Sequence, residues 1–114
     1  MSNFELGIWG ERQAVRFLKK HKYKVIDVNY RCHIGEIDAV ARDGEYLVFI
    51  EVKTRASARY GLPAEAVDEV KQRKLLFLAQ YYQKYKRLLN MPIRFDVVEI
   101  LGEEIRLIKG AFCA

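Results

Sequence analysis

The feature that most limits how this chain can fold is a pair of strand-like segments joined by Arg42-Asp43-Gly44-Glu45, with Asp-Gly at the centre of the connection. The second segment carries no charged residue from Tyr46 to Ile50. A continuous apolar run of this kind is typical of a central strand covered on both faces. Asp-Gly between two such segments is a strong signal for a β-hairpin. The sequence therefore predicts a hairpin inside a covered sheet, with strands at 34–41 and 46–53.

The other segments predict helices against that sheet and a second hairpin. Apolar periodicity indicates helices over 4–21 and 64–89, the second ended by Asn90 and Pro92. Strands are expected at 23–29, 94–101 and 104–111, the last two joined around Gly102. The order α-β-β-β-α-β-β, without linker or repeat, predicts one α/β domain over 1–114. We expect a mixed central sheet flanked by helices.

Length and composition exclude several classes of protein. The chain has 114 residues, of which 51% are hydrophobic and 31% charged, which suits one domain with a core rather than a disordered segment. No apolar run approaches the roughly 20 residues that cross a bilayer, and residues 1–5 do not resemble a signal peptide. We therefore expect a cytoplasmic protein without membrane contact, with Cys32 and Cys113 as reduced thiols.

The distribution of charge says more than the net value of +5. From Val70 to Phe95 there are seven lysines and arginines and no acid, whereas acids gather in the central strands. A basic periphery around an acidic centre suits an enzyme that cuts phosphodiesters with a metal ion, because the cations hold the backbone and the carboxylates hold the metal. The alternative is an ordinary solvated helix face rich in lysine.

The central hairpin contains the residues that indicate chemistry. Strand alternation places Glu36 with Asp38 on one face of the first strand, and Glu51 with Lys53 on one face of the second. Two carboxylates from neighbouring strands suit Mg²⁺, which takes oxygen ligands and keeps several waters. A lysine beside them is able to orient the attacking water or neutralise charge on the phosphate. The alternative is a cross-strand salt bridge with a structural role alone.

Charged residues also interrupt the apolar faces of both helices. Glu11 falls in the middle of a face shared by apolar residues of the first helix, where a carboxylate is costly unless paired. The alternative is that Glu11 caps the helix or pairs with a nearby lysine. The other members of that face are Phe4, Gly7, Ile8, Ala14, Val15 and Leu18.

In the long helix, Lys71 and Lys74 project into the apolar arc. They must snorkel outward or meet an acid or a phosphate. We expect Lys71, with Lys74, to reach the strand acids or a substrate phosphate; snorkelling is the alternative. The arc also contains tyrosines that suit a core better than base stacking. The members of the arc are Ala66, Val67, Val70, Leu75, Phe77, Leu78, Tyr81, Tyr82, Tyr85 and Leu89.

The pattern Asp38-x12-Glu51-Val52-Lys53 resembles the core motif of the restriction-endonuclease-like superfamily. Across nearly the whole chain the sequence resembles one branch of it, the bacterial YraN family of endonuclease-like proteins. Ile37 departs from the proline that the superfamily often carries before its first aspartate. Matching segments are Gly10-Glu11-x-x-Ala14, Asn29-Tyr30-Arg31, Gly35-Glu36-Ile37-Asp38, Phe49-Ile50-Glu51-Val52-Lys53-Thr54-Arg55, Glu65-Ala66-Val67, Lys71-Gln72-Arg73-Lys74 and Arg94-Phe95-Asp96-Val97-Val98.

The resemblance implies an αβββαβ core with an extra C-terminal strand, and a similarity to archaeal Holliday-junction resolvases. In those enzymes a helix glutamate joins the strand carboxylates at the metal, and Glu11 would take that place here. We expect Asp38, Glu51 and Lys53 to be catalytic, with Asp38, Glu51 and Glu11 as ligands of Mg²⁺ or Mn²⁺. Glu36 is expected to support the ligands or to accept from an N–H group, and Lys71 to assist.

The expected function is a metal-dependent endonuclease acting on DNA, including branched or structured DNA. Arg55, Lys71, Arg73 and Lys74 are the expected contacts to the nucleic acid. A junction-cutting version requires a homodimer, because it makes two symmetric incisions. The rival is a non-catalytic accessory protein that binds nucleic acid with the same fold. A domain that does not touch nucleic acid fits the basic surface poorly. The sequence does not choose between DNA and RNA.

Overall fold

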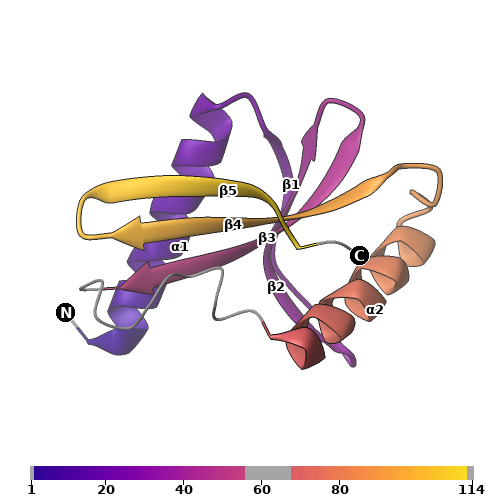
Figure 1. The fold of residues 1–114 in the computed structure, drawn as a ribbon, viewed down its shortest axis with the longest axis horizontal. Coiled ribbons are helices and arrows are strands. Elements are labelled where there is room, and N and C mark those ends of the chain that lie inside the picture. Colours follow the sequence, from indigo (N-terminus) through magenta and orange to yellow (C-terminus); the bar gives the residue numbers. More distant parts are fainter. Residues whose placement is uncertain (1, 56–67, 113–114) are drawn as a thin grey trace.

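A five-stranded sheet in the order β1-β2-β3-β4-β5 forms the centre of the molecule (Figure 1). The computed structural model describes residues 2–55 and 68–112. The order of elements along the chain is the predicted one, α-β-β-β-α-β-β. Their bounds are α1 (Asn3–Lys20), β1 (Lys24–Cys32), β2 (Gly35–Asp43), β3 (Tyr46–Arg55), α2 (Glu69–Tyr85), β4 (Ile93–Leu101) and β5 (Glu104–Phe112).

The sheet is mixed, as predicted. β3 and β4 run parallel, while β1–β2, β2–β3 and β4–β5 are antiparallel. The β2–β3 turn is tighter than expected, because Asp43 pairs with Tyr46 and only Gly44 and Glu45 form the turn. Gly44 has a φ of +60°, a left-handed conformation that glycine adopts without strain. This tight turn fixes the register of the two strands that carry the predicted acids.

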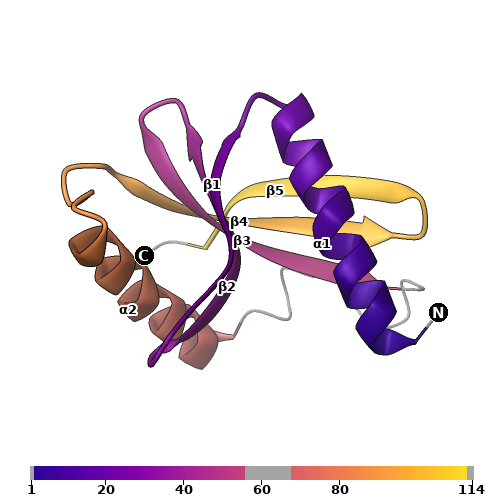
Figure 2. The ribbon, with the colours of Figure 1, turned by 180° about the vertical axis from the view of Figure 1, so that it is seen from behind.

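The two helices cover opposite faces of the sheet (Figures 1 and 2). α1 packs Ala14 and Leu18 on strand residues that include Val48 and Ile50. α2 packs a second core, centred on Phe49, against the other face. Successive residues of β3 thus point into different cores, which explains the uninterrupted apolar run in the sequence. None of the helices in the described ranges 2–55 and 68–112 is long and apolar enough to cross a membrane.

The buried stripe of α1 differs from the predicted one. Gly10, Ala14 and Leu18 are buried, whereas Phe4 is 77% exposed and Ile8 also reaches solvent. The cause is the close approach of Gly10 to Thr54 on β3, where no side chain would fit between the two elements. Apolar periodicity misses this contact because glycine carries no hydrophobic side chain. The predicted central place of Glu11 on the core face was therefore wrong, and Glu11 is half-buried at the margin of the stripe.

α2 is shorter than the predicted helix, and it buries a narrower face than the one predicted. Asp68 caps it, accepting a 2.8 Å hydrogen bond from the Lys71 N–H, so the helix begins at Glu69. It ends at Tyr85, ahead of Arg87 in a left-handed conformation. Predicted positions 64–67 lie outside the described residues. Only part of the predicted arc is buried, because this helix is apolar on both sides. Its buried members are Leu75, Leu78 and Tyr82, whereas Val70, Phe77, Tyr85 and Leu89 are exposed.

A buried aspartate ties β4 to its surroundings. The Asp96 side chain is fully buried and accepts hydrogen bonds from the Tyr23 hydroxyl at 2.8 Å, from Arg94 Nε at 2.9 Å and from the Gly110 N–H at 3.0 Å. Arg94 also donates to Asp43 at 2.8 Å. These contacts satisfy a buried charge and join three segments of the chain. Asp96 belongs to the motif of the resemblance, and its role here is structural.

Candidate functional site

The candidate site lies where the β2–β3 ladder ends. The last paired residues at this end are Ala39 and Ile50, so Asp38 and Glu51 stand next along the two strands and face one another. Asp38 Oδ2 accepts a 2.7 Å hydrogen bond from the Val52 N–H. A side chain thus takes the place of a strand carbonyl for this backbone donor. The sequence predicted that these two carboxylates share a face at the margin of the core, and the structure brings them together.

Asp38 and Glu51 form a pair of like charges in a partly dry environment. Burial is the main cause that raises the pKa of Asp38 to about 7, and the nearby charge of Glu51 acts in the same direction, against the Val52 N–H, which lowers it. Glu51 lies within hydrogen-bonding reach of the Asp38 carboxyl. At neutral pH the pair therefore shares an excess of negative charge that a cation would relieve.

Two lysines from different elements meet this pair. Lys53 follows Glu51 on β3, and Lys71 Nζ lies 3.6 Å from Glu51 Oε2. Burial lowers the pKa of Lys53, and the charge of Lys71 lowers it further, while Glu51 and Asp38 oppose the shift. The two acids and two lysines therefore form one electrostatic cluster. Lys71 occupies the predicted position against the strand acids, close to the N-terminal end of α2.

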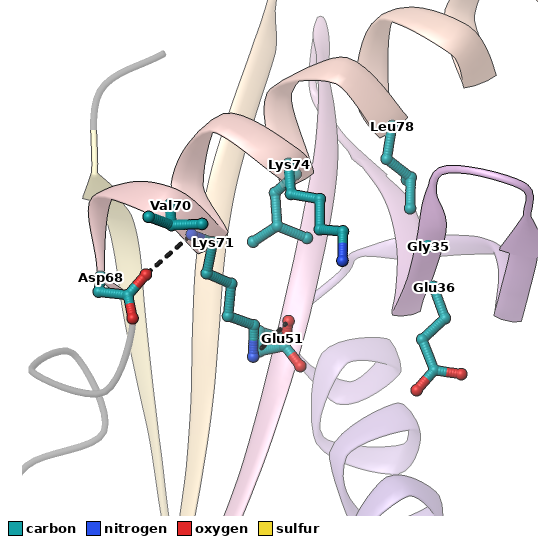
Figure 3. Close-up of a pocket in the computed structure, with 9 residues that line it drawn as sticks. Gly35, Glu36, Glu51, Asp68, Val70, Lys71, Lys74 and Leu78 are labelled. Carbon is teal, nitrogen blue, oxygen red and sulfur yellow. Dashed lines mark hydrogen bonds and ion pairs between the residues drawn. The ribbon is translucent and has the colours of Figure 1, made fainter.

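A pocket of about 410 Å³ opens beside this cluster, between α2 and the start of β2. Figure 3 shows Lys71 extending from α2 to Glu51, and Lys74 pointing from the next turn toward the same hollow. The side chain of Glu36 points away from Glu51 in this view. The pocket is lined by Gly35, Glu36, Glu51, Asp68, Val70, Lys71, Lys74, Leu75 and Leu78.

Glu11 occupies a neighbouring hollow and not this pocket. That hollow, about 300 Å³, is lined by Glu11 with Val52, Lys53 and Thr54 and by the first turns of α1. Glu11 and Lys53 therefore border one hollow, while Asp38 and Glu51 form the closer carboxylate pair. In the described ranges 2–55 and 68–112, no three His, Cys, Asp or Glu side chains converge closely enough to hold a metal ion. The predicted three-carboxylate ligand set stays a prediction.

The remaining predicted residues surround the cluster at different distances. Glu36 is exposed and pairs with Arg31 at 3.1 Å across the β1–β2 hairpin. Arg55 is the last residue of β3 and is half-buried. Arg73 and Lys74 are exposed on α2, and only Lys74 borders the pocket. Lys74 is thus the better placed of these two cations to contact a ligand at the cluster.

Asp68 is a pocket residue that the sequence reasoning missed. Its carboxylate caps α2 and lies at the pocket wall near Lys71. The signal was present, because an Asp directly before a helical segment is a preferred N-cap. The expected helix start at residue 64 placed Asp68 inside the helix and hid this signal.

The donor set suits a divalent cation of the Mg²⁺ type. Mg²⁺ is usually held by one or two carboxylates and keeps several waters, so Asp38 and Glu51 are the residues that would hold such an ion. Burial, and after it the charge of Glu51, raises the pKa of Asp38, so the ionised pair is costly in this environment. A cation between the carboxylates would supply a compensating positive charge and would lower the Asp38 pKa.

Together, the fold and the cluster define an α/β protein in which paired strand carboxylates and two lysines meet beneath the start of a helix. The chain belongs to the Uncharacterised protein family UPF0102, the YraN family, whose model matches residues 10–100. This confirms the family to which the motifs pointed.

Three relatives show how far the similarity extends, and each is described as a UPF0102 protein. That of Caldicellulosiruptor saccharolyticus is 44% identical over 98% of this chain and 100% of its own length. That of Lachnoclostridium phytofermentans is 49% identical over 95% of this chain and 92% of its own. That of Clostridioides difficile is 41% identical over 98% of this chain and 100% of its own. The similarity thus spans the whole fold, including both helices and the cluster.

Proposed function

We propose that this protein is a metal-dependent endonuclease that hydrolyses phosphodiester bonds in DNA, including branched or structured DNA. The observation that carries the proposal is the cluster of Asp38, Glu51, Lys53 and Lys71 at a pocket beneath α2. A purely structural salt bridge would pair each acid with a cation. Here two acids face one another, and the pKa of Asp38 is raised to about 7.

Each residue of the cluster has a distinct part in the proposed reaction. Asp38 and Glu51 are the proposed ligands of the metal ion, with Glu11 assisting from the hollow that it borders together with Lys53. Lys53, whose pKa is lowered, orients the attacking water through a hydrogen bond. Lys71 holds Glu51 in place and presents positive charge to the phosphate. Lys74, at the pocket rim, binds a neighbouring phosphate together with Arg55 and Arg73 on the approach.

The metal ion, Mg²⁺ or Mn²⁺, would supply a Lewis acid for the phosphate oxygen and a lowered pKa for a bound water. The protein residues supply position and charge. Since Lys71 comes from α2 and the carboxylates come from the hairpin, the site depends on the docking of α2 on the sheet. A version that cuts four-way junctions would act as a homodimer, because two symmetric cuts need two sites.

A substrate panel tests the proposal. Single-stranded, duplex, flapped and four-way DNA are incubated with Mg²⁺ or Mn²⁺ and wild-type protein, Asp38→Asn or Lys53→Ala. Glu45→Gln is the matched control, because it also removes one negative charge but lies in the exposed β2–β3 turn. We expect cutting by wild type and by the control, and loss in the other two variants. Salt-sensitive binding without cutting under either metal would favour the non-catalytic accessory protein.

Metal binding has its own readout. A ligand at one hundred times its Kd stabilises the folded state by about 2.7 kcal/mol. Mn²⁺ should therefore raise the Tm of wild type and of Glu45→Gln, but not that of Asp38→Asn. Equal shifts in all three proteins would place the metal elsewhere.

A further inference from the structure

One face of α2 is exposed, aromatic and basic, and the proposed cleavage reaction does not use most of it. Phe77 is 59% exposed and Tyr85 is 71% exposed, although both are large rings. At 100° per residue they share a face with Val70, Lys74 and Tyr81. We call Phe77, Tyr81 and Tyr85 the aromatic ridge. Tyr81 is half-buried between the two exposed rings, and a contiguous exposed apolar patch of this kind is typical of an interaction site.

The rings are held in order by their neighbours. Tyr81 and Tyr85 are nearly parallel, with ring centroids 6.0 Å apart and an interplanar angle of 13°. His33, from the turn between β1 and β2, packs edge-on against Tyr81 at 5.0 Å. The ridge is therefore partly pre-ordered, which lowers the entropic cost of stacking a flat ligand on it.

The positive charge of this face of α2 favours a polyanion as the ligand. Arg73, Lys74 and Lys84 are exposed beside the ridge, and the chain has no acid between Glu69 and Asp96. A second copy of the chain would be a poor occupant, because a two-fold contact brings the same patch against itself. That contact would place cations against cations with no acid between them. A nucleic acid satisfies both the cations, through its phosphates, and the rings, through its bases.

The ridge also leads to the candidate site. Val70 and Lys74 line the pocket that contains Glu51 (Figure 3). At 100° per residue the rings of the ridge follow them on the same helix face, toward the C-terminal end of α2. The rise of about 1.5 Å per residue places Tyr85 roughly 16 Å beyond Lys74. At the stacked spacing of about 3.4 Å, this length matches about five nucleotides of one strand.

We infer that the aromatic ridge binds a single-stranded segment of DNA and directs it to the pocket at Glu51. Unpaired bases expose their flat faces to aromatic rings, whereas bases in a duplex are stacked on one another and expose only their edges. The inference rests on the proposed nuclease function and narrows its substrate. The preferred DNA would carry an unpaired segment next to the cut.

Binding in the absence of divalent metal tests the ridge separately from cleavage. Fluorescence anisotropy in EDTA compares a labelled single-stranded DNA, the matching duplex and the matching single-stranded RNA. We expect Tyr85→Ala and Phe77→Ala to weaken single-strand binding roughly 5- to 100-fold, with duplex binding little changed. Gln80→Ala, an exposed and uncharged change on the same helix, is the matched control. Tyr85→Phe should retain binding, because it keeps the ring.

The outcomes separate the two proposals. Ridge-dependent single-strand binding without any cleavage in Mg²⁺ or Mn²⁺ would support the ridge and overturn the nuclease. Unchanged single-strand affinity in Tyr85→Ala and Phe77→Ala, or equal losses for single strand and duplex, would overturn the ridge. A wild-type dimer that these variants dissociate would also overturn it, in favour of self-association. Tighter binding of RNA than of DNA would overturn DNA as the ligand. Thermal unfolding of each variant checks that it is folded.

Discussion

Gly10→Ala is the substitution for which the structure gives the sharpest expectation. A Cβ atom at this position would overlap Oγ1 of Thr54 and lie 3.0 Å from its Cβ and 3.2 Å from its Cγ2. Rotation of the threonine side chain relieves the first contact but not the second, since the threonine Cβ is fixed to the backbone of β3. α1 must therefore lift from the sheet. Gly7, in the same helix, would have nothing within 4 Å of an added Cβ and provides the matched control.

The magnitude follows from two opposing effects. Alanine is favoured over glycine inside a helix by about 1 kcal/mol, and this gain applies to both positions. Overpacking costs about 1–3 kcal/mol and applies to Gly10 alone. Gly7→Ala should therefore stabilise the fold by up to about 1 kcal/mol, and Gly10→Ala should be less stable than Gly7→Ala by about 1–3 kcal/mol.

Urea unfolding measures both free energies by linear extrapolation. Thr54→Ala in the Gly10→Ala background removes two of the three contacting atoms and should restore part of the loss, which a double-mutant cycle quantifies. Equal stabilisation by Gly7→Ala and Gly10→Ala would refute the close packing of α1 on β3. Because Glu11 follows Gly10, the lifted helix should also move Glu11 away from Lys53. A displacement near 1 Å is able to lower a rate about 100-fold.

Three further substitutions test the cluster and the core. In metal-free protein the Asp38 pKa, raised to about 7, exceeds its unfolded value of 3.8, so stability should fall as pH rises between these values. Asp38→Asn should remove this slope and exceed wild type by about 1–3 kcal/mol near pH 8 in urea unfolding; parallel pH curves would contradict it. Lys71→Ala should lower the cleavage rate at least about 10-fold, whereas Lys20→Ala, exposed on α1, should not. A normal rate in Lys71→Ala would show that the ion pair between Lys71 and Glu51 does not contribute to cleavage. Asp96→Ala should cost about 3–5 kcal/mol, because it removes the buried carboxylate that accepts from Tyr23, Arg94 and the Gly110 N–H and leaves Arg94 with Asp43 alone as its acid. Tyr23→Phe should cost only about 1 kcal/mol, and similar losses for the two variants in thermal unfolding would argue against the network.

The sequence was sufficient to predict the strands and the pairing of their acids. The sequence predicted Asp38 and Glu51 on neighbouring strands of one hairpin, and the two-residue turn of the structure, tighter than expected, sets the register in which they face one another. The contact of Lys71 with the strand acids was predicted for a different reason, because a lysine near an apolar arc needs a partner. In both cases the charged residues have few arrangements that avoid an unpaired charge in the core.

The faces of the helices were harder to predict. α1 rotates to place Gly10 on Thr54, and the value of a glycine lies in the space it leaves, which hydrophobicity does not record. α2 carries four rings, of which Tyr82 is the buried one: it packs against Phe49, and its hydroxyl donates to Asp27 at 3.1 Å. Which helix face is buried thus depends on contacts with residues that are distant in sequence. Which face of each helix packs on the sheet also determines that Tyr85 is exposed and that Glu11 borders a hollow with Lys53.

The hydrogen bond from the Val52 N–H to Asp38 affects how the family can change over time. The carboxylate completes the hydrogen bonding of a strand end, so selection for a stable fold would act on this position whether or not the residue also takes part in a reaction. A lineage that lost turnover would still be under pressure to keep an acceptor here. Asparagine preserves that acceptor and alanine does not. In relatives that descend from an active ancestor and have lost activity, we therefore expect substitutions at Lys53 or Lys71 before substitutions at Asp38.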